Sequence, residues 1–190
     1  GSLFSVVEEE KKRRRPIYWP KALNKAVEDK IPQVELQDPI EHARIDKNVW
    51  AATFDIKASF FQVELPPRTR EFFGLMTNCG CHRFKRLPMG FNASPFVMNE
   101  ITKLCAATGV SKVRTDVYID NVRFTSASKE KVILASKIFK ERCDEFGITL
   151  NEEPGNTPHM NGDFLGLNFN YATGEVKLAQ KTLNKIRKAT

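Results

Sequence analysis

The chain has 190 residues, of which 41% are hydrophobic and 28% charged, so it can bury a full-sized core as one domain or two joined subdomains. Its net charge of +7 and pI of about 9.3 favour an anionic partner, most commonly nucleic acid, although a solvated lysine-rich surface gives the same charge. No apolar run reaches the length of a membrane span and no signal-peptide pattern is present, so we expect no membrane partner.

The four cysteines are spaced irregularly, which is not the pattern of a disulfide framework. We therefore expect an intracellular protein, cytoplasmic or nuclear, in a reducing compartment. A zinc site at Cys79, Cys81 and His82 is disfavoured, because Cys-x-Cys is too short for the usual zinc knuckle and no second Cys/His pair follows at a suitable distance.

The N-terminal half opens with an acidic block and a basic block over residues 8–15, a composition typical of a disordered arm or a nuclear-localisation-like patch. Pro16 ends any helix there. The elements expected next are a short strand over 17–19, a helical turn over 21–28, an extended connector over 31–40, a helix over 39–48, strands over 50–54 and 62–65, and a hairpin formed by 72–77 and 82–87.

In the C-terminal half, Ser94 is a candidate helix N-cap with Pro95 at the first helical position. The expected elements are a helix over 95–107, strands over 113–119 and 122–125, a helix over 128–146, a strand over 148–150, a hairpin of 163–170 with 176–178, and a helix from about residue 180. This order predicts an α+β fold: a ferredoxin-like antiparallel sheet with two helices on one face.

Two acidic residues follow buried strands in this scheme. Asp55 ends the strand over 50–54, and Asp120 lies at a hairpin tip that we expect to consist of Asp120 and Asn121. The two strands are neighbours in a ferredoxin-like sheet, so the carboxylates should converge and repel unless cations bind. Oxygen ligands in a basic chain point to Mg²⁺ and a phosphate substrate. Two unrelated solvated acids remain the alternative.

Four segments in order resemble the fingers and palm of a retroviral or retrotransposon reverse transcriptase, over about residues 13–178. They are Phe54-Asp55-Ile56-Lys57-Ala58-Ser59-Phe60-Phe61-Gln62, Leu87-Pro88-Met89-Gly90-Phe91-Asn92-Ala93-Ser94-Pro95-Phe96, Tyr118-Ile119-Asp120-Asn121, and Phe164-Leu165-Gly166. The resemblance implies a right-hand polymerase palm with a mixed fingers subdomain. Fingers would be residues 1–37 and 62–93, palm 38–61 and 94–178, and residues 179–190 the start of a truncated thumb or connection.

The resemblance also implies roles for individual residues. Asp55 and Asp120 correspond to the metal-binding aspartates, with the Ile56 carbonyl as a further ligand and Asn121 beside them. Phe60 takes the place of the aromatic gate that favours deoxynucleotides, with an ordinary core aromatic as the alternative. Met89-Gly90 corresponds to the nucleotide-lining loop, Arg15 and Lys11 or Lys12 to triphosphate ligands, and Tyr118 with Phe164-Leu165-Gly166 to the primer-holding surface.

Two departures from the family pattern bear on the chemistry. The family's hairpin motif is Tyr-x-Asp-Asp, and Asn121 stands here in place of the second aspartate. Asn offers a carbonyl oxygen but no charge, so metal affinity and rate should fall. The family also commonly has a Lys in the loop after residue 150 that serves as a general acid. This chain has Glu152-Glu153 there, with His159 as a possible substitute.

The resemblance implies an RNA-directed DNA polymerase that adds deoxynucleotides to a primer 3′-OH with two Mg²⁺ or Mn²⁺ ions. Its partners would be an RNA or DNA template with primer, a dNTP, and the thumb and RNase H parts of a parent polyprotein. The alternative is an impaired or inactive domain that acts as a nucleic-acid or protein scaffold. An Asn121 engineered to trap substrate, and an RNA-templated RNA polymerase that Phe60 disfavours, are the further alternatives.

Overall fold

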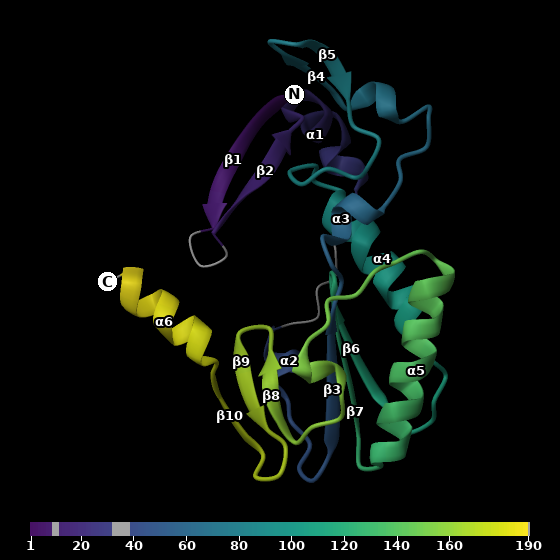
Figure 1. Ribbon diagram of the computed structural model, residues 1–190, viewed down its shortest axis with the longest axis vertical. Coiled ribbons are helices and arrows are strands. Elements are labelled where there is room, and N and C mark those ends of the chain that lie inside the picture. Colours follow the sequence, from purple (N-terminus) through teal and green to yellow (C-terminus); the bar gives the residue numbers. More distant parts are fainter. Residues whose placement is uncertain (9–11, 32–38, 190) are drawn as a thin grey trace. The chain divides into compact units, whose positions relative to one another are not determined.

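The computed structural model describes residues 1–8, 12–31 and 39–189, and within them the chain forms two compact units (Figure 1). The first contains Gly1–Val34 and Ala58–Met98, and the second contains Glu35–Lys57 and Asn99–Thr190. Across the described ranges, no helix is both long enough and apolar enough to cross a membrane.

The first unit contains two antiparallel hairpins and short helices. Strand β1 (Ser2–Glu8) pairs with β2 (Arg13–Trp19), and β4 (Gly74–Thr77) pairs with β5 (Gly80–Arg83). The helices are α1 (Lys21–Val27), α3 (Ser59–Gln62) and the 3₁₀ turns Glu28–Lys30 and Arg70–Phe72. The basic residues 13–15, expected in a disordered arm, lie in β2, and Arg15 forms an ion pair with Glu8 at 2.6 Å.

The strand expected over residues 62–65 is wrong. Helix α3 extends to Gln62, and Glu64 alone makes a β-bridge, with Arg86. The ladder is confined to the backbone bonds Leu65 N to Lys85 O and Leu87 N to Val63 O, both 2.9 Å. Pro66 and Pro67 follow and have no N–H to donate, so the ladder cannot continue.

Aromatic and aliphatic residues form the core of the first unit: Tyr18, Leu65, Phe73 and Leu87 are buried, and Phe60 packs against them. The Tyr18 hydroxyl donates to the Gly74 carbonyl oxygen at 2.8 Å, which satisfies its polar end. Burial raises the pKa of Tyr18.

The main sheet of the second unit has the strand order β3-β7-β6, all antiparallel, formed by β3 (Trp50–Asp55), β7 (Asn121–Ser126) and β6 (Arg114–Tyr118). Helix α5 (Lys129–Glu145) packs on β3 and β7. Its start is fixed by Ser128, whose hydroxyl accepts from the Lys131 backbone N–H. The rings of Phe54, Phe124 and Phe139 pack edge-on or tilted between this helix and the sheet, with centroids 5.2–6.0 Å apart.

Helix α4 (Ser94–Ala106) begins in the first unit and continues in the second. The Ser94 hydroxyl, expected to cap it, donates to the Pro88 carbonyl oxygen at 2.8 Å. In the second unit, Arg142 of α5 donates to the Leu104 and Ala107 carbonyl oxygens, so α4 and α5 lie side by side.

The fourth strand of the sheet, expected over residues 148–150, is reduced to one bridge between Ile56 and Leu150. Lys57 N donates to Thr149 O at 3.0 Å and Asn151 N to Asp55 O at 2.8 Å. Ala58 then turns the chain away with φ 46°, so the pairing stops there.

A second sheet of the same unit has the order β10-β9-β8, with β8 (Asn161–Phe164), β9 (Leu167–Asn170) and β10 (Glu175–Leu178). The single strand expected over 163–170 is therefore wrong, because a turn divides it. Helix α6 (Gln180–Ala189) follows β10, the 3₁₀ turn Pro154–Asn156 precedes β8, and the helix expected over 39–48 spans only α2 (Pro39–Ala43). Val49, Ala51, Phe164, Phe169 and Tyr171 form the core shared by the two sheets.

Candidate active site

Asp55 and Asp120 lie at the ends of neighbouring segments in the main sheet. Asp55 is the last residue of β3 and pairs in register with Asn121, the first residue of β7. The Ile56 N–H donates to the Asp120 carbonyl oxygen at 3.1 Å, which holds the two backbones together. The structure therefore brings together Asp55, Ile56, Asp120 and Asn121, the residues expected at the metal site.

The hairpin tip differs from the expected Asp120-Asn121 pair. Tyr118 pairs with Asn121, so the two-residue turn is formed by Ile119 and Asp120. Ile119 takes φ 55°, a left-handed conformation that is unfavourable for a β-branched residue. Its N–H donates to the side-chain oxygen of buried Asn99 on α4 at 3.0 Å, so the turn is held from the helix.

Side-chain amides hold both carboxylates. Asn121 Nδ2 donates to Asp120 Oδ1 at 3.1 Å, and Asn151 Nδ2 donates to Asp55 Oδ2. Asn151 was not expected at the site, although its position after the segment that pairs with Ile56 is a signal for it. Among the described residues, no three His, Cys, Asp or Glu side chains form a metal-holding group. Two carboxylates, supplemented by amide and backbone carbonyl oxygens, still fit a hard divalent cation.

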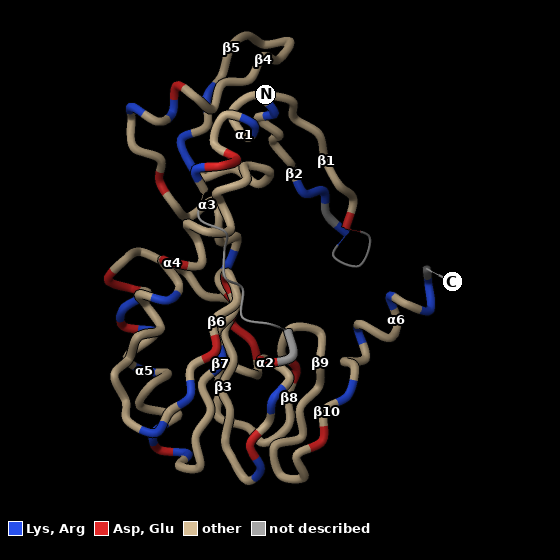
Figure 2. Tube along the Cα trace, turned by 180° about the vertical axis from the view of Figure 1, so that it is seen from behind, with Lys and Arg blue, Asp and Glu red and all other residues tan. Residues whose placement is uncertain are grey.

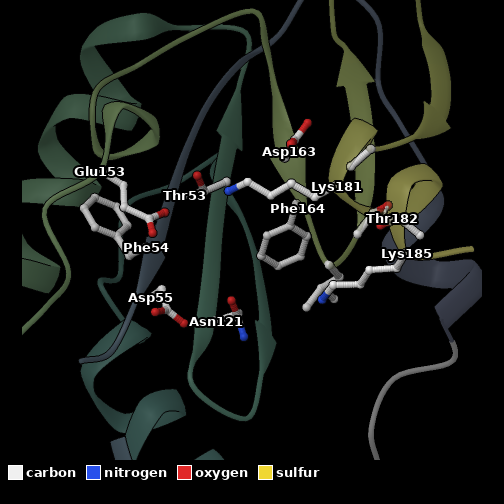
Figure 3. Close-up of a pocket in the computed structure, with 13 residues that line it drawn as sticks. Thr53, Phe54, Asp55, Asn121, Glu153, Asp163, Phe164, Lys181, Thr182 and Lys185 are labelled. Carbon is white, nitrogen blue, oxygen red and sulfur yellow. Dashed lines mark hydrogen bonds between the residues drawn. The ribbon is translucent and has the colours of Figure 1, made fainter. Parts of the chain in front are cut away.

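A pocket of about 260 Å³ opens beside these residues (Figure 3). Asp55 and Asn121 line it on the main sheet, and Phe164, Leu165 and Gly166 line it on the second sheet. The remaining lining residues are Thr53, Phe54, Glu153, Asp163, Ala179, Lys181, Thr182 and Lys185. Carboxylates and lysines thus face the same space, which suits a metal-bound phosphate.

The turn between β8 and β9 is formed by Leu165 and Gly166, with φ values of 49° and 80°. Positive φ at both positions is the geometry of a tight type I′ hairpin. The Gly166 carbonyl oxygen accepts from the Ala179 N–H at 2.9 Å and from the Thr182 hydroxyl at 2.8 Å. The turn is therefore attached to the beginning of α6, which brings Lys181 and Lys185 to the pocket. The sequence did not single out these two lysines.

Tyr118, expected to contact primer or template, does not line this pocket. Its ring lies edge-on to the His42 ring, with centroids 5.8 Å apart. His159, expected as a substitute acid, also lies outside the pocket lining. Its backbone bridges to Ala51 of β3, and its Nδ1 lies 3.0 Å from the Thr157 carbonyl oxygen.

The expected nucleotide-binding residues all belong to the first unit. Phe60, Met89 and Gly90 line one pocket of about 340 Å³ there. Gly90 has φ 100°, and a Cβ at this position would lie 2.3 Å from the Tyr18 carbonyl oxygen, so no other residue fits. Arg15 is half-buried against Glu8, and Lys12 lies exposed in the turn directly before β2, with φ 46°. Lys11 lies outside the described residues.

The family model described as "Reverse transcriptase (RNA-dependent DNA polymerase)" matches residues 7–169. The chain belongs to the reverse transcriptase family. The resemblance drawn from its four motifs is confirmed, and so is the α+β palm-type fold with antiparallel sheets.

Curated relatives of this reverse transcriptase domain include transposon and viral polyproteins. The Pol polyprotein of transposon 412 from Drosophila melanogaster is 23% identical over 76% of this chain and 12% of its own length. The enzymatic polyprotein of Cauliflower mosaic virus (strain Strasbourg) is 25% identical over 90% of the chain and 25% of its own length. The chain thus spans about a quarter or less of these relatives.

Among solved structures, the foamy viral protease-reverse transcriptase resembles the domain in fold. The structure in complex with double-stranded DNA has a TM-score of 0.76 at 18% identity, covering 99% of this chain and 32% of that one. The structure in complex with an RNA/DNA hybrid has a TM-score of 0.69 at 18% identity, covering 99% and 24%. At this identity the likeness establishes the fold.

In this reverse transcriptase domain the loop that follows Leu150 brings an acid to the pocket. Glu153 lines the same space as Asp55 and Asn121 (Figure 3). A negative charge thus stands in the loop where the family commonly has a Lys. The four cysteines are free thiols, with Cys79 and Cys81 exposed and Cys105 and Cys143 buried. The expected reducing compartment stays a prediction.

Proposed function

We propose that this chain is the catalytic fingers-palm part of a retroelement reverse transcriptase, which adds deoxynucleotides to a primer 3′-OH on an RNA or DNA template. The first unit would be the fingers and the second the palm. The observation that carries the proposal is the placement of Asp55 and Asp120 at adjoining strand ends, with Asp55 lining the pocket that the 164–166 turn also lines.

Asp55, Asp120 and the Ile56 carbonyl oxygen would hold the Mg²⁺ or Mn²⁺ ions, and the Asn121 amide oxygen is an uncharged further donor. Two such ions, when bound, activate the attacking hydroxyl and neutralise charge on the leaving pyrophosphate. Asn151 orients the Asp55 carboxylate through its hydrogen bond. The amide of Asn121 does the same for Asp120.

Lys181, Lys185 and the 164–166 turn would hold the primer end. Basic residues follow α6 along its length (Figure 2), and two of them, Lys181 and Lys185, line the pocket. Charge-assisted contacts from lysine to phosphate oxygens position the nucleic acid without reading its sequence. The relatives in complex with double-stranded DNA and with an RNA/DNA hybrid support such a partner.

In the first unit, Phe60, Met89 and Gly90 would line the incoming dNTP, and Lys12 and Arg15 would hold its triphosphate. Arg15 forms an ion pair with Glu8, so binding a triphosphate would exchange one anionic partner for another. Phe60 would exclude a ribose 2′-OH by crowding.

The test is primer extension on an RNA template, using the parent protein in its natural length with the variants Asp120→Ala and Asn121→Asp. We expect template-directed addition of deoxynucleotides that Asp120→Ala abolishes. If the parent protein never extends a primer and Asn121→Asp does not change that, the chain is not a polymerase.

A second function has one specific observation in its favour. Asn121 replaces the family's second acid, and its amide donates to Asp120, so the site carries less negative charge than the family pattern. An inactive domain that binds nucleic acid as a scaffold would bind primer–template without extending it. Duplex binding that persists in an inactive parent protein would support this alternative.

A further inference from the structure

A buried ion pair lies in the second unit, apart from the residues that the proposed chemistry uses. Asp116 of β6 and Arg123 of β7 face each other in register, and each side chain is only 2% exposed. Arg123 Nη2 lies 2.8 Å from Asp116 Oδ2, and Nε donates to the same oxygen at 2.9 Å. Arg114 donates to the other carboxylate oxygen at 3.0 and 3.1 Å, so Asp116 is fully engaged.

The Arg123 guanidinium makes cation–π contacts with two aromatic rings of the second sheet. Its Cζ lies 4.6 Å from the ring centroid of Phe164 and 4.6 Å from that of Phe169. Nη2 also donates to the His42 carbonyl oxygen at 2.8 Å. The cation is thus held by directional hydrogen bonds and by contacts with two aromatic rings.

Arg123 connects two elements of the candidate active site. It lies two residues after Asn121 on β7, and residues two apart in a strand face the same side of a sheet. Phe164 begins the turn that Leu165 and Gly166 complete, and it lines the pocket together with Asn121. The position of the turn relative to Asp120 and Asn121 therefore depends on where this guanidinium lies.

Core packing alone does not account for an arginine here. A buried ion pair loses most of its Coulombic gain to desolvation, and an apolar side chain of similar volume often stabilises a core as well or better. A guanidinium differs from an apolar side chain in its directional bonds, which specify one arrangement of the groups around it.

We propose that Arg123 is a positioning residue that holds the Phe164–Leu167 turn in place against β7, which begins at Asn121, through its cation–π contacts with Phe164 and Phe169 and its ion pair with Asp116. The functional consequence of this inference, the placement of the primer end, rests on the proposed function. The structural part concerns this chain alone and can be tested without polymerase activity.

The first experiment compares backbone amide hydrogen–deuterium exchange in the chain and in three variants. Arg123→Met keeps the length and loses the charge, and Arg123→Lys keeps the charge and loses the planar fork. Arg114→Met is the matched control, because Arg114 pairs with the same Asp116 from a partly exposed position. We expect both Arg123 variants to raise exchange across residues 161–170 at least tenfold, an effect on the order of the loss of one strong contact, while Arg114→Met changes it little.

The second experiment measures primer extension by the parent protein with the same variants. We expect Arg123→Lys to raise the apparent Kd for primer–template or lower kcat on the order of tenfold, with the KM for dNTP unchanged. The proposal would be overturned if Arg114→Met impaired primer extension as much as the Arg123 variants do, or if Arg123→Lys extended primers as well as the unsubstituted protein. Either result would mean that Arg123 only balances the charge of Asp116.

The two experiments separate failure of the inference from failure of the proposed function. Unchanged exchange over 161–170 in folded Arg123→Met or Arg123→Lys overturns the positioning role, whatever the polymerase does. If Arg123→Met does not fold, Arg123→Lys decides the matter by the same readout. Changed exchange in a protein that never extends a primer supports the positioning role and removes only the catalytic consequence.

Discussion

Asn121 is the residue at which this chain departs from the family motif at the candidate metal site. Its amide donates to Asp120 Oδ1, so an aspartate at this position would exchange a hydrogen bond for the repulsion of two carboxylates. We expect Asn121→Asp to lower stability by about 1 kcal/mol without divalent cations, a fall of about 2–4 °C in Tm for a chain of this size.

Divalent cations should reverse that effect, because a ligand that binds the folded state stabilises it. Thermal unfolding with EDTA and with MgCl₂ checks this, and the rise in Tm on adding Mg²⁺ should be larger for Asn121→Asp than for the unsubstituted chain. Asp163→Asn, which changes another acid of the pocket wall, is the control and should leave the Mg²⁺ response unaltered. An equal response in all three proteins would contradict a metal site at Asp120.

His42 is a buried histidine whose pKa is lowered mainly by burial, and further by Arg123 and Arg114, while Asp116 and Glu41 oppose the shift. Its Nδ1 lies 3.9 Å from Asp116 Oδ1, and its ring lies edge-on to those of Tyr118 and Phe164. Neither ring nitrogen has a hydrogen-bond partner among the described residues. The imidazole is therefore neutral in the folded protein at neutral pH.

A lowered pKa means that the unfolded chain binds the proton more readily than the folded one. Stability should then fall as pH drops below the ordinary value of 6.5 and level off below the folded pKa. We expect His42→Phe to reduce this pH-dependent loss of stability by about 1 kcal/mol for each unit by which folding lowers the pKa of His42. Urea unfolding at pH 7.5 and 5.5 measures it, and an identical loss in both proteins would contradict the prediction.

Substitution of Phe60 tests whether the pocket of the first unit binds the incoming nucleotide. If its ring crowds the sugar, Phe60→Val should raise incorporation of ribonucleotides relative to deoxynucleotides on the order of tenfold. The measurement is the ratio of kcat/KM for matched rNTP and dNTP in the parent protein. Phe61→Val is the neighbouring control. Loss of both activities in parallel would show that Phe60 serves only the core cluster against which it packs.

At the scale of elements, the hairpin of β6 and β7 carries its strain at one residue. Ile119 has φ 55°, which costs on the order of 1–3 kcal/mol for a β-branched side chain. We expect Ile119→Asn, which tolerates this conformation, to raise the unfolding free energy by about 1 kcal/mol. Chemical denaturation checks the sign. Ile119→Val keeps the β-branched side chain and the strain, so its unfolding free energy should not rise. A lower unfolding free energy for Ile119→Asn would contradict the assignment of strain to Ile119.

The long amphipathic helices and the β6–β7 hairpin could be predicted, since their periodicity and caps lie within a short stretch of sequence. The turns at Ile119 and Leu165 could not, because neither residue type favours positive φ and strand pairing imposes it. The strand expected over 148–150 is reduced to one bridge, because the segment that follows β3 pairs with it only at Ile56. This limit comes from the tertiary structure and leaves no trace in the local sequence pattern.

The candidate site divides in the same way. Asp55, Asp120 and the Phe164-Leu165-Gly166 segment could be found, although not the turn that the segment forms, because each belongs to a motif whose order along the chain is informative. Asn151 is separated from Asp55 by 96 positions, and Arg123 from His42 by 81. The position of Asn151 directly after the segment that pairs with Ile56 is a signal for the first contact. The second contact joins β7 to α2 through tertiary packing, and the local sequence gives no signal for it.

At the scale of the whole molecule, a basic chain of the reverse transcriptase family carries two aspartates at its candidate metal site. With a net charge of +7 we expect salt-dependent attraction to nucleic acid, which an inactive scaffold would share. What distinguishes an enzyme is a divalent cation at Asp55 and Asp120.

The most direct measurement is paramagnetic broadening of backbone amide NMR signals on titrating Mn²⁺ into this chain. We predict broadening centred on residues 55–57 and 119–121, lost in Asp55→Asn, retained in Asp163→Asn, and appearing at lower Mn²⁺ concentration in Asn121→Asp. Broadening that centres elsewhere, or that survives Asp55→Asn unchanged, would contradict the metal site and with it the proposed chemistry.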